Sequence, residues 1–356
     1  MATASSRSHQ SDAAATLVLG GRDIARLLPM ERCIDAIEDA FARHALGETI
    51  AAGVLGTHVH GGGFHVKAAG LLGSATGPAV YAAKINANFP ANPRERGLPT
   101  IQGVIALFDA TNGRVLAVMD SVAITSLRTA AATAVAAKYL APPIAAVTLC
   151  GCGEQGGHQL EALACVRPLD HVWVYDVVPE RARAFAERMT ATLGTTVAAV
   201  DNILNNAAAS TVWITCTTSR RWFLGREHVA AGTFVAAVGA DNPDKQEIEP
   251  ELLAASAVVA DVIEQCAVIG DLHHALEAGV LRREDVRADL TALVSKRQDI
   301  RRSTDEIVVF DSTGTALEDV AAAVMAYDQA LASGAGAHVD LSGSIGSLTR
   351  REPLRA

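Results

Sequence analysis

Three glycines, Gly151, Gly153 and Gly156, have the spacing of a ligand-binding turn in this chain of 356 residues. An apolar segment, 145–150, leads into Gly151-Cys152-Gly153-Glu154-Gln155-Gly156, and a helical stretch follows to about residue 166. In a dinucleotide-binding turn the first glycine permits the sharp bend, the second lets the backbone approach a pyrophosphate, and the third lets the helix pack on the strand. The pyrophosphate would lie at the helix N-terminus, where unpaired N–H groups point outward.

An acidic residue, Asp176, closes the next predicted strand, 20 residues after Gly156. A carboxylate at this position accepts hydrogen bonds from the ribose hydroxyls of NAD and repels the 2′-phosphate of NADP. Arg181 and Arg183 follow closely and could weaken that discrimination. NAD is therefore the expected cofactor, with NADP as the alternative.

Polar residues follow two later predicted strands, 211–216 and 233–238. The first leads into Thr217-Thr218-Ser219, and the second into Gly239-Ala240-Asp241. In a doubly wound sheet the groups that act on a bound ligand lie at the carboxyl ends of the strands. Asp241 is therefore a candidate general acid/base, although an aspartate in such a loop can equally be an ordinary turn residue.

Four basic residues in the first part of the chain could bind an acidic substrate. Lys84 lies in an otherwise apolar strand, where a lysine is costly unless it is paired or faces a pocket. Arg128 lies in an alanine-rich helix, from which its planar guanidinium could bind a carboxylate. His65 and Lys67 alternate with apolar residues and so project from one face of a strand. Each could instead be a surface charge with a buried stem.

The elements that must position these residues form two groups. In the first, short strands and two helices (22–28 and 30–46) precede a hairpin, 101–109 with 114–120, and a helix, 124–140. Pro142-Pro143 ends that helix and marks a boundary. In the second, strands alternate with helices, which predicts a parallel sheet with crossovers. The strands expected there are 145–150, 171–176, 211–216, 233–238 and 257–261.

The predicted fold class is α/β, a Rossmann-type doubly wound parallel sheet plus an α+β substrate and dimerisation domain. Residues 142–302 are expected to form the dinucleotide-binding domain. Residues 16–141 are expected to form the other, joined by 303–356, which carry a strand at 305–311 and a helix at 316–333. Residues 1–15, rich in Ser and Ala without the apolar centre of a signal peptide, are expected to be a disordered tail.

Composition excludes several classes of function. The formal net charge is −9, which argues against a nucleic-acid partner, and no apolar run reaches the ~20 residues of a membrane span. The six cysteines are scattered, as is typical of free thiols in the cytoplasm. His58, His60 and His65 lack acidic or cysteine neighbours, so no metal is expected. His273-His274 is expected at a helix surface or cap.

Several segments together resemble the ornithine cyclodeaminase/mu-crystallin family, in the expected order over roughly residues 20–330. They are Lys84-Ile85-Asn86-Ala87-Asn88-Phe89-Pro90, Gly97-Leu98-Pro99-Thr100, Met119-Asp120-Ser121, Ile124-Thr125 with Arg128-Thr129-Ala130-Ala131, Gly239-Ala240-Asp241 with Lys245 and Glu247, and Phe310-Asp311-Ser312-Thr313-Gly314. The resemblance implies a homodimer that acts on a small amino or imino acid. It assigns the catalytic aspartate to Asp241, the active-site lysine to Lys84 and the carboxylate-binding arginine to Arg128.

The chain departs from the family pattern in its early strands. The family often has a second arginine there, upstream of a methionine, but no arginine occurs between Arg43 and Arg94, and the methionine position corresponds to Lys67. His65 falls where ornithine cyclodeaminases have a glutamate that contacts the substrate amino group. We therefore expect that the side chains binding the substrate carboxylate differ from the family pattern, and that Arg128, Lys67 and His65 bind the substrate. The residues expected around the cofactor are Gly151, Gly153, Glu154, Gln155, Gly156, Asp176, Arg181, Thr215, Thr217, Val238 and Ser312.

Three functions remain open from the sequence. The first is an NAD(P)H-dependent reductase of α-imino acids, which run backwards is an amino-acid dehydrogenase. The second is a redox-neutral cyclodeaminase of ornithine or lysine, in which NAD is recycled and ammonia is released. The third is a protein that binds the cofactor without turnover, a role that retention of Lys84, Arg128 and Asp241 argues against.

Overall fold

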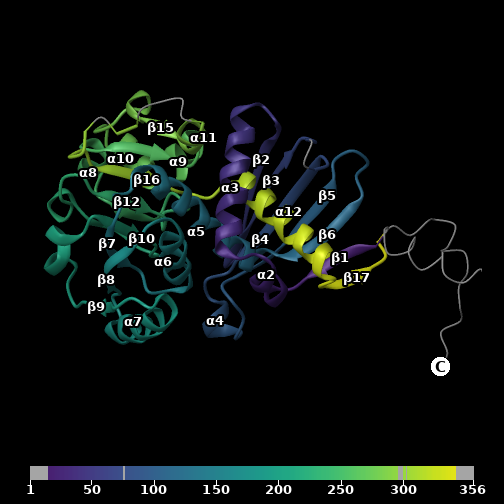
Figure 1. Cartoon of the computed structure of the whole chain (residues 1–356), viewed down its shortest axis with the longest axis horizontal. Helices are drawn as coiled ribbons and strands as arrows, with labels where there is room; N and C mark the ends of the chain where they lie inside the picture. Colours follow the sequence, from purple (N-terminus) through teal and green to yellow (C-terminus); the bar gives the residue numbers. More distant parts are fainter. Residues whose placement is uncertain (1–14, 75–76, 296–299, 302, 342–356) are drawn as a thin grey trace, which may run out of the picture. The chain divides into compact units, whose positions relative to one another are not determined.

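The structure, a computed structural model, describes residues 15–74, 77–295, 300–301 and 303–341, which group into two compact units (Figure 1). The sheet unit holds the described parts of 1–28, 48–124 and 319–356, and the Rossmann unit holds those of 29–47 and 125–318. The division falls inside two helices, α5 (Ser121–Leu140) and α12 (Ala316–Ser333). It differs from the expected boundaries at 141/142 and 302/303. The expected tail lies outside the described residues, apart from Ala15.

The sheet unit is built on seven strands in the order β17-β1-β6-β5-β4-β3-β2. All neighbouring pairs run antiparallel except β1 with β6. The strands are β1 (Thr16–Leu19), β2 (Thr49–Val59), β3 (Gly62–Leu71), β4 (Val80–Asn88), β5 (Ile101–Asp109), β6 (Val115–Asp120) and β17 (Ala337–Val339). Two short helices, α2 (Gly21–Leu27) and α4 (Asn92–Glu95), complete the unit with most of α12, drawn in yellow in Figure 1.

The Rossmann unit contains an eight-stranded sheet in the order β15-β14-β16-β12-β10-β7-β8-β9, in which every neighbouring pair is parallel. Its strands are β7 (Ala145–Cys150), β8 (Leu169–Tyr175), β9 (Val197–Ala199), β10 (Val212–Thr215), β12 (Phe234–Ala237), β14 (Ala257–Ala260), β15 (Ala288–Asp289) and β16 (Val308–Asp311). A separate parallel pair joins β11 (Arg220–Leu224) to β13 (Gln246–Ile248). This architecture confirms the predicted doubly wound α/β class.

The Rossmann unit also contains helices. They are α3 (Met30–Ala45), α6 (Glu154–Val166), α7 (Pro179–Leu193), α8 (Pro250–Ala254), α9 (Ile263–Ile269), α10 (Asp271–Glu277) and α11 (Leu290–Val294), with 3₁₀ turns at Ile203–Ala209, Arg226–His228 and Arg283–Asp285. α3 groups with this unit because it packs against α6 and α11. α5 begins three residues before the expected Ile124. The Asp120 carboxylate accepts a hydrogen bond from the Ala123 N–H at 2.8 Å and so stabilises an earlier start.

The placement of the strand expected at 305–311 was wrong. It was expected to return to the first domain, but β16 lies between β12 and β14 in the Rossmann sheet. Val308, Val309 and Phe310 are fully buried there, as suits a central strand covered on both faces. Only the part of α12 from Asp319 onward joins the sheet unit.

The order of the strands shows where this sheet would bind a ligand. From β7 the chain moves outward to β8 and β9, then returns to β10 on the other side of β7. Strand order therefore reverses between β7 and β10. In open parallel sheets ligands bind outside the carboxyl ends of the strands at such a switch point.

Candidate active site

The glycine turn lies at this switch point, between β7 and α6. Gly151 has φ +107°, and a Cβ there would come within 2.8 Å of the Cys216 carbonyl oxygen. At Gly156 a Cβ would come within 2.5 Å of the Gly151 carbonyl oxygen, so α6 packs tightly on the turn. By contrast, a Cβ at Gly153 would meet no described atom within 4 Å. Gly151 and Gly156 are thus required by the protein's own packing, whereas Gly153 faces open space.

That open space fits the pyrophosphate of a dinucleotide. Gly153 is the N-cap of α6 and has an extended backbone, so the N–H groups of the first turn, including those of Glu154 and Gln155, begin just beyond it. A helix N-terminus with no side chain in front of it admits phosphate oxygens close to these donors. This turn would therefore hold the pyrophosphate of NAD, whose nicotinamide supplies hydride-transfer chemistry when bound.

Asp176 directly follows β8 and is nearly buried. Its Oδ2 accepts a hydrogen bond from Cys152 N at 3.1 Å, and its Oδ1 accepts one from Val178 N at 2.9 Å. Arg181 Nη1 lies 3.3 Å from Oδ1, although the arginine side chain is 57% exposed. The backbone therefore fixes this carboxylate against the glycine turn, where it can meet a ribose, and Arg181 partly neutralises it. Arg183 instead pairs with Glu180 at 2.8 Å.

The remaining predicted cofactor residues lie together at the carboxyl ends of three neighbouring strands. Thr215 ends β10, Val238 follows β12 and Ser312 follows β16. Val238 N donates to the Thr215 carbonyl at 2.8 Å, and Ser312 N donates to the Ala237 carbonyl at 2.9 Å. This edge of the sheet also contains the switch point, so these residues adjoin the glycine turn.

Glu247 is a fully buried carboxylate that joins two of these loops. Its Oε1 accepts a hydrogen bond from Thr217 N at 2.6 Å, and its Oε2 accepts one from Gly239 N at 2.8 Å. A Cβ at Gly239 would overlap this carboxylate, so the glycine is required for the close approach. The sequence showed Glu247 as part of a family motif but did not indicate that its side chain fixes the loop after β10 and the loop carrying Asp241.

Asp241 itself is an exposed residue of the loop after β12. Lys245 Nζ lies 2.7 Å from its Oδ1, and Asn242 Nδ2 donates to the same oxygen at 3.1 Å. This carboxylate is accessible, and one of its oxygens has an ammonium and an amide donor as neighbours. It can therefore accept a proton from a ligand.

Two buried aspartates join the start of α10 to β13 and β16. Asp271 Oδ1 accepts hydrogen bonds from Glu247 N at 2.8 Å and Ile248 N at 2.9 Å. Asp311, the last residue of β16, accepts one from Leu272 N at 2.9 Å. Burial raises the pKa of Asp311 from 3.8 to about 7. It also raises the pKa values of Asp271 and Glu247.

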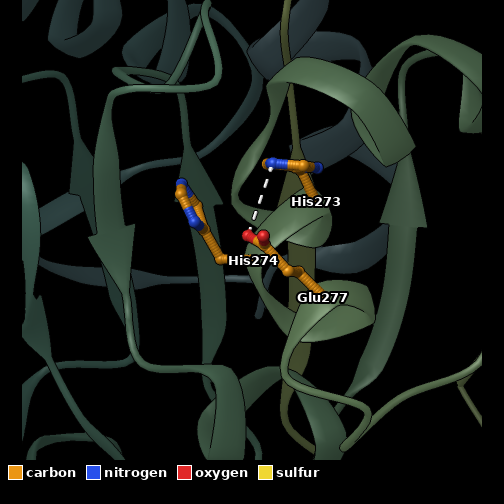
Figure 2. A group of neighbouring side chains, drawn as sticks. All are labelled: His273, His274 and Glu277. Carbon is orange, nitrogen blue, oxygen red and sulfur yellow. Dashed lines mark ion pairs between the residues drawn. The ribbon is translucent and has the colours of Figure 1, made fainter.

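His273, His274 and Glu277 lie on α10 (Figure 2). His273 faces Glu277, with 3.8 Å between Nε2 and Oε2, whereas the ring of His274 turns to another side. His274 Nε2 lies 2.8 Å from the Lys245 carbonyl oxygen. A carbonyl only accepts, so this nitrogen donates and ties α10 to the loop. The nitrogen and oxygen atoms of the three side chains are close enough to ligate a metal, but no metal is expected from the sequence, and that remains a prediction.

Arg128 is buried within the Rossmann unit. Its Nη1 donates to Glu318 Oε2 at 2.8 Å, and both side chains are at most 4% exposed. A Cβ at Gly314, which has φ +72°, would overlap the guanidinium. Gly314 therefore lets Arg128 lie directly against the backbone after β16. The arginine is not a surface charge.

Lys84 is buried within the sheet unit. Its Nζ lies 2.9 Å from Oδ1 and 2.7 Å from Oδ2 of Asp319, which lies on α12. Lys67 is the direct cross-strand partner of Lys84, and His65 is that of Asn86. Cross-strand partners project from the same face of a sheet, so His65, Lys67 and Lys84 share one face, as the alternation on β3 predicted.

Comparison with known proteins relates this chain and its fold to one family. Residues 15–334 match the model of the ornithine cyclodeaminase/mu-crystallin family. An archaeal alanine dehydrogenase, a dimer with bound NAD, is 34% identical and covers 92% of this chain and 99% of its own, with a TM-score of 0.86. The Δ1-pyrroline-2-carboxylate reductase of Thermococcus litoralis, in complex with NADH and L-proline, is 30% identical and covers 91% and 100%, with a TM-score of 0.85.

A third relative, the iminosuccinate reductase of Paracoccus denitrificans, is 33% identical over 334 residues, or 91% of this chain and 100% of its own. The class defined by the fold and the turn is a dinucleotide-binding α/β protein with a second, mixed sheet. The chain belongs to the ornithine cyclodeaminase/mu-crystallin family, which confirms the resemblance. No helix among the described residues is long and apolar enough to cross a membrane.

Proposed function

We propose that this protein is an NAD-dependent reductase of α-imino acids that transfers hydride to the α-carbon and, run backwards, oxidises an amino acid. The observation that carries this proposal is the burial of Lys84 and Arg128 in a chain that also keeps a complete dinucleotide turn. Burying a cation is costly, so its retention beside a carboxylate points to a use in binding. Relatives named alanine dehydrogenase, iminosuccinate reductase and Δ1-pyrroline-2-carboxylate reductase support the same chemistry.

In this proposal each residue has a separate task. Arg128, with Lys67, binds the α-carboxylate of the substrate, and His65 lies on the same sheet face as Lys67. Lys84, a cation held by Asp319, donates a hydrogen bond that orients the reacting group. Asp241 exchanges a proton with the substrate nitrogen. Hydride adds to the imine carbon and a proton to the nitrogen, so an amino acid and oxidised cofactor leave.

The cofactor preference proposed is NAD. Asp176 would accept hydrogen bonds from the ribose hydroxyls, and its charge would oppose a 2′-phosphate. The exposed Arg181, 3.3 Å from that carboxylate, moderates this opposition. We place the reaction in the cytoplasm, which suits six cysteines that are all free thiols.

The proposed assembly is a homodimer formed through the sheet unit. Leu55, Val66, Ile85 and Val104 are successive cross-strand partners on β2 to β5 and so form one apolar row. Leu55 is 62% exposed, and Ile85 and Val104 are each 44% exposed. A contiguous exposed apolar face of this kind favours a protein partner. A second copy of this chain is the partner that the dimeric archaeal relative supports.

Asp241→Asn tests the proposed reaction. Turnover of imino acids, assayed as cyclic imines and as 2-oxo acids with ammonia, should fall by ~10²- to 10⁴-fold because the group that exchanges a proton with the substrate nitrogen is lost, while NADH binding is retained. Asp244→Asn, on the same exposed loop, is the matched control and should keep its activity. Full activity in the Asp241 variant would overturn its role.

Stoichiometry separates the reductase from the cyclodeaminase after which the family is named. The reductase oxidises one NADH for each imino acid consumed, which is followed at the nicotinamide absorbance. Ammonia release from ornithine or lysine without net absorbance change would identify the lyase instead. Binding of NAD without turnover of any substrate in the panel would favour a non-enzymatic role.

A further inference from the structure

The two cations expected to contact substrate are held by neighbouring residues of the sequence. Arg128 pairs with Glu318 inside the Rossmann unit, and Lys84 pairs with Asp319 inside the sheet unit. Both acids lie in the first turn of α12 and are nearly or fully buried.

Glu318 is fixed by hydrogen bonds to Thr315 in addition to its pair with Arg128. Thr315 N donates to Glu318 Oε1 at 3.3 Å, and Glu318 N donates to Thr315 Oγ1 at 3.3 Å. This reciprocal pair is a capping box at the start of α12. The other oxygen, Oε2, accepts from Arg128 Nη1. Each carboxylate oxygen therefore has its own donor, and the backbone at Gly314 lies directly against the guanidinium.

Asp319 offsets the repulsion between two lysines in the sheet unit. Lys67 and Lys84 are directly opposite on β3 and β4, and like charges in that position destabilise a sheet. Asp319 places both oxygens within 2.9 Å of Lys84 Nζ. The carboxylate compensates the buried ammonium and fixes the direction of its N–H groups.

We propose that Glu318 and Asp319 are positioning residues for substrate: Glu318 orients the guanidinium of Arg128 toward the substrate carboxylate, and Asp319 orients the ammonium of Lys84 toward the reacting group. This inference rests on the proposed function. A role in stability alone explains the arrangement poorly, because buried ion pairs can often be replaced by apolar residues without loss of stability. What the pairs provide is a fixed orientation of two long, flexible side chains.

A double-mutant cycle tests the Glu318 part without requiring turnover. The probe is pyrrole-2-carboxylate, a planar carboxylate that cannot accept hydride, titrated calorimetrically into the NADH-loaded protein. Glu318→Gln should weaken its binding by about tenfold or more, because the guanidinium loses the carboxylate that holds it in the binding orientation. In the Arg128→Lys background the same substitution should change binding by no more than about twofold, because Glu318 then has no guanidinium to orient.

Matched variants separate positioning from folding. Asp328→Asn, on the same helix, should leave probe binding and NADH binding unchanged. Thr315→Ala keeps the Glu318 carboxylate but removes its capping partner, and should weaken the probe by a smaller factor that also vanishes in the Arg128→Lys background. This variant carries the test if Glu318→Gln does not fold. Equal losses in both backgrounds, parallel loss of NADH affinity, or absence of probe binding to the wild type would each overturn the inference.

Asp319 is tested by kinetics. Asp319→Asn should lower kcat more than it raises KM, because Lys84 acts on the reacting group, and Asp319→Glu should recover part of kcat. A rise in KM alone, or no recovery with glutamate, contradicts this role. A wild type that binds the probe with the expected coupling but turns over no imino acid would refute the proposed reaction while supporting the positioning of Arg128.

Discussion

At the scale of single residues, cofactor choice depends on Asp176. Its carboxylate is fixed by two backbone N–H groups, so it cannot turn away from a bound ribose without losing them. We expect Asp176→Ser to weaken NADH binding by about tenfold and to strengthen NADPH binding, since the repulsion is removed and Arg181 remains to meet a 2′-phosphate. Nicotinamide fluorescence titrations measure both constants.

Asp170→Ser, at the exposed start of β8, is the matched control for that change. It also removes a carboxylate, but at the other end of β8 from the glycine turn. The affinities for NADH and NADPH should therefore stay at their wild-type values. An unchanged ratio of NADH to NADPH affinity in Asp176→Ser would show that this carboxylate does not select the cofactor.

At the scale of elements, Glu247 joins two loops through both of its oxygens. In Glu247→Gln one oxygen becomes an NH₂ group that cannot accept a hydrogen bond, so either Thr217 N or Gly239 N is left unsatisfied. We expect the free energy of unfolding to fall by about 1–3 kcal/mol, as measured by urea denaturation. Glu251→Gln, on the exposed first turn of α8, should change it little. Equal stability of the two variants would contradict the two-loop role.

The carboxyl group of Asp311, at the end of β16, should make the free energy of unfolding depend on pH. Its pKa rises from 3.8 to about 7 on folding because the side chain is buried. Between about pH 4 and pH 7 the folded protein therefore holds a proton that the unfolded chain has released, and this contribution to stability falls as pH rises. We expect Asp311→Asn to lose less stability than the wild type between pH 5 and pH 8 in urea unfolding. Parallel pH profiles would show that Asp311 does not titrate in this range.

The sequence predicted those parts of the molecule that depend on local sterics. The turn at Gly151 and Gly156 is such a part, because its glycines are required by contacts within a few residues or with the adjacent strand. The place of β16 could not be predicted, because a short apolar run fits a buried strand of either sheet. Nor could the partners of Arg128 and Lys84, which lie 190 and 235 residues away in sequence.

At the scale of the whole molecule, the apolar row on β2 to β5 predicts the oligomeric state. Val104→Lys places a charge in the middle of that row, where a second copy would have to bury it. We expect the variant to be a monomer and the wild type a dimer in size-exclusion chromatography with light scattering. Val268→Lys, at an exposed apolar position on α9 of the Rossmann unit, should leave the dimer intact. A wild type that is monomeric at all concentrations would refute the proposed interface.

The adjacency of Glu318 and Asp319 has a consequence for how this chain can change in evolution or by design. Successive residues of an α-helix are separated by about 100° around its axis. Inserting one residue between the two acids would rotate one of them away from its cation, whatever residue was used. The spacing from Gly314 to Asp319 therefore cannot change without loss of one of the two pairs. Libraries that seek new substrates should leave this register unaltered and vary side chains elsewhere.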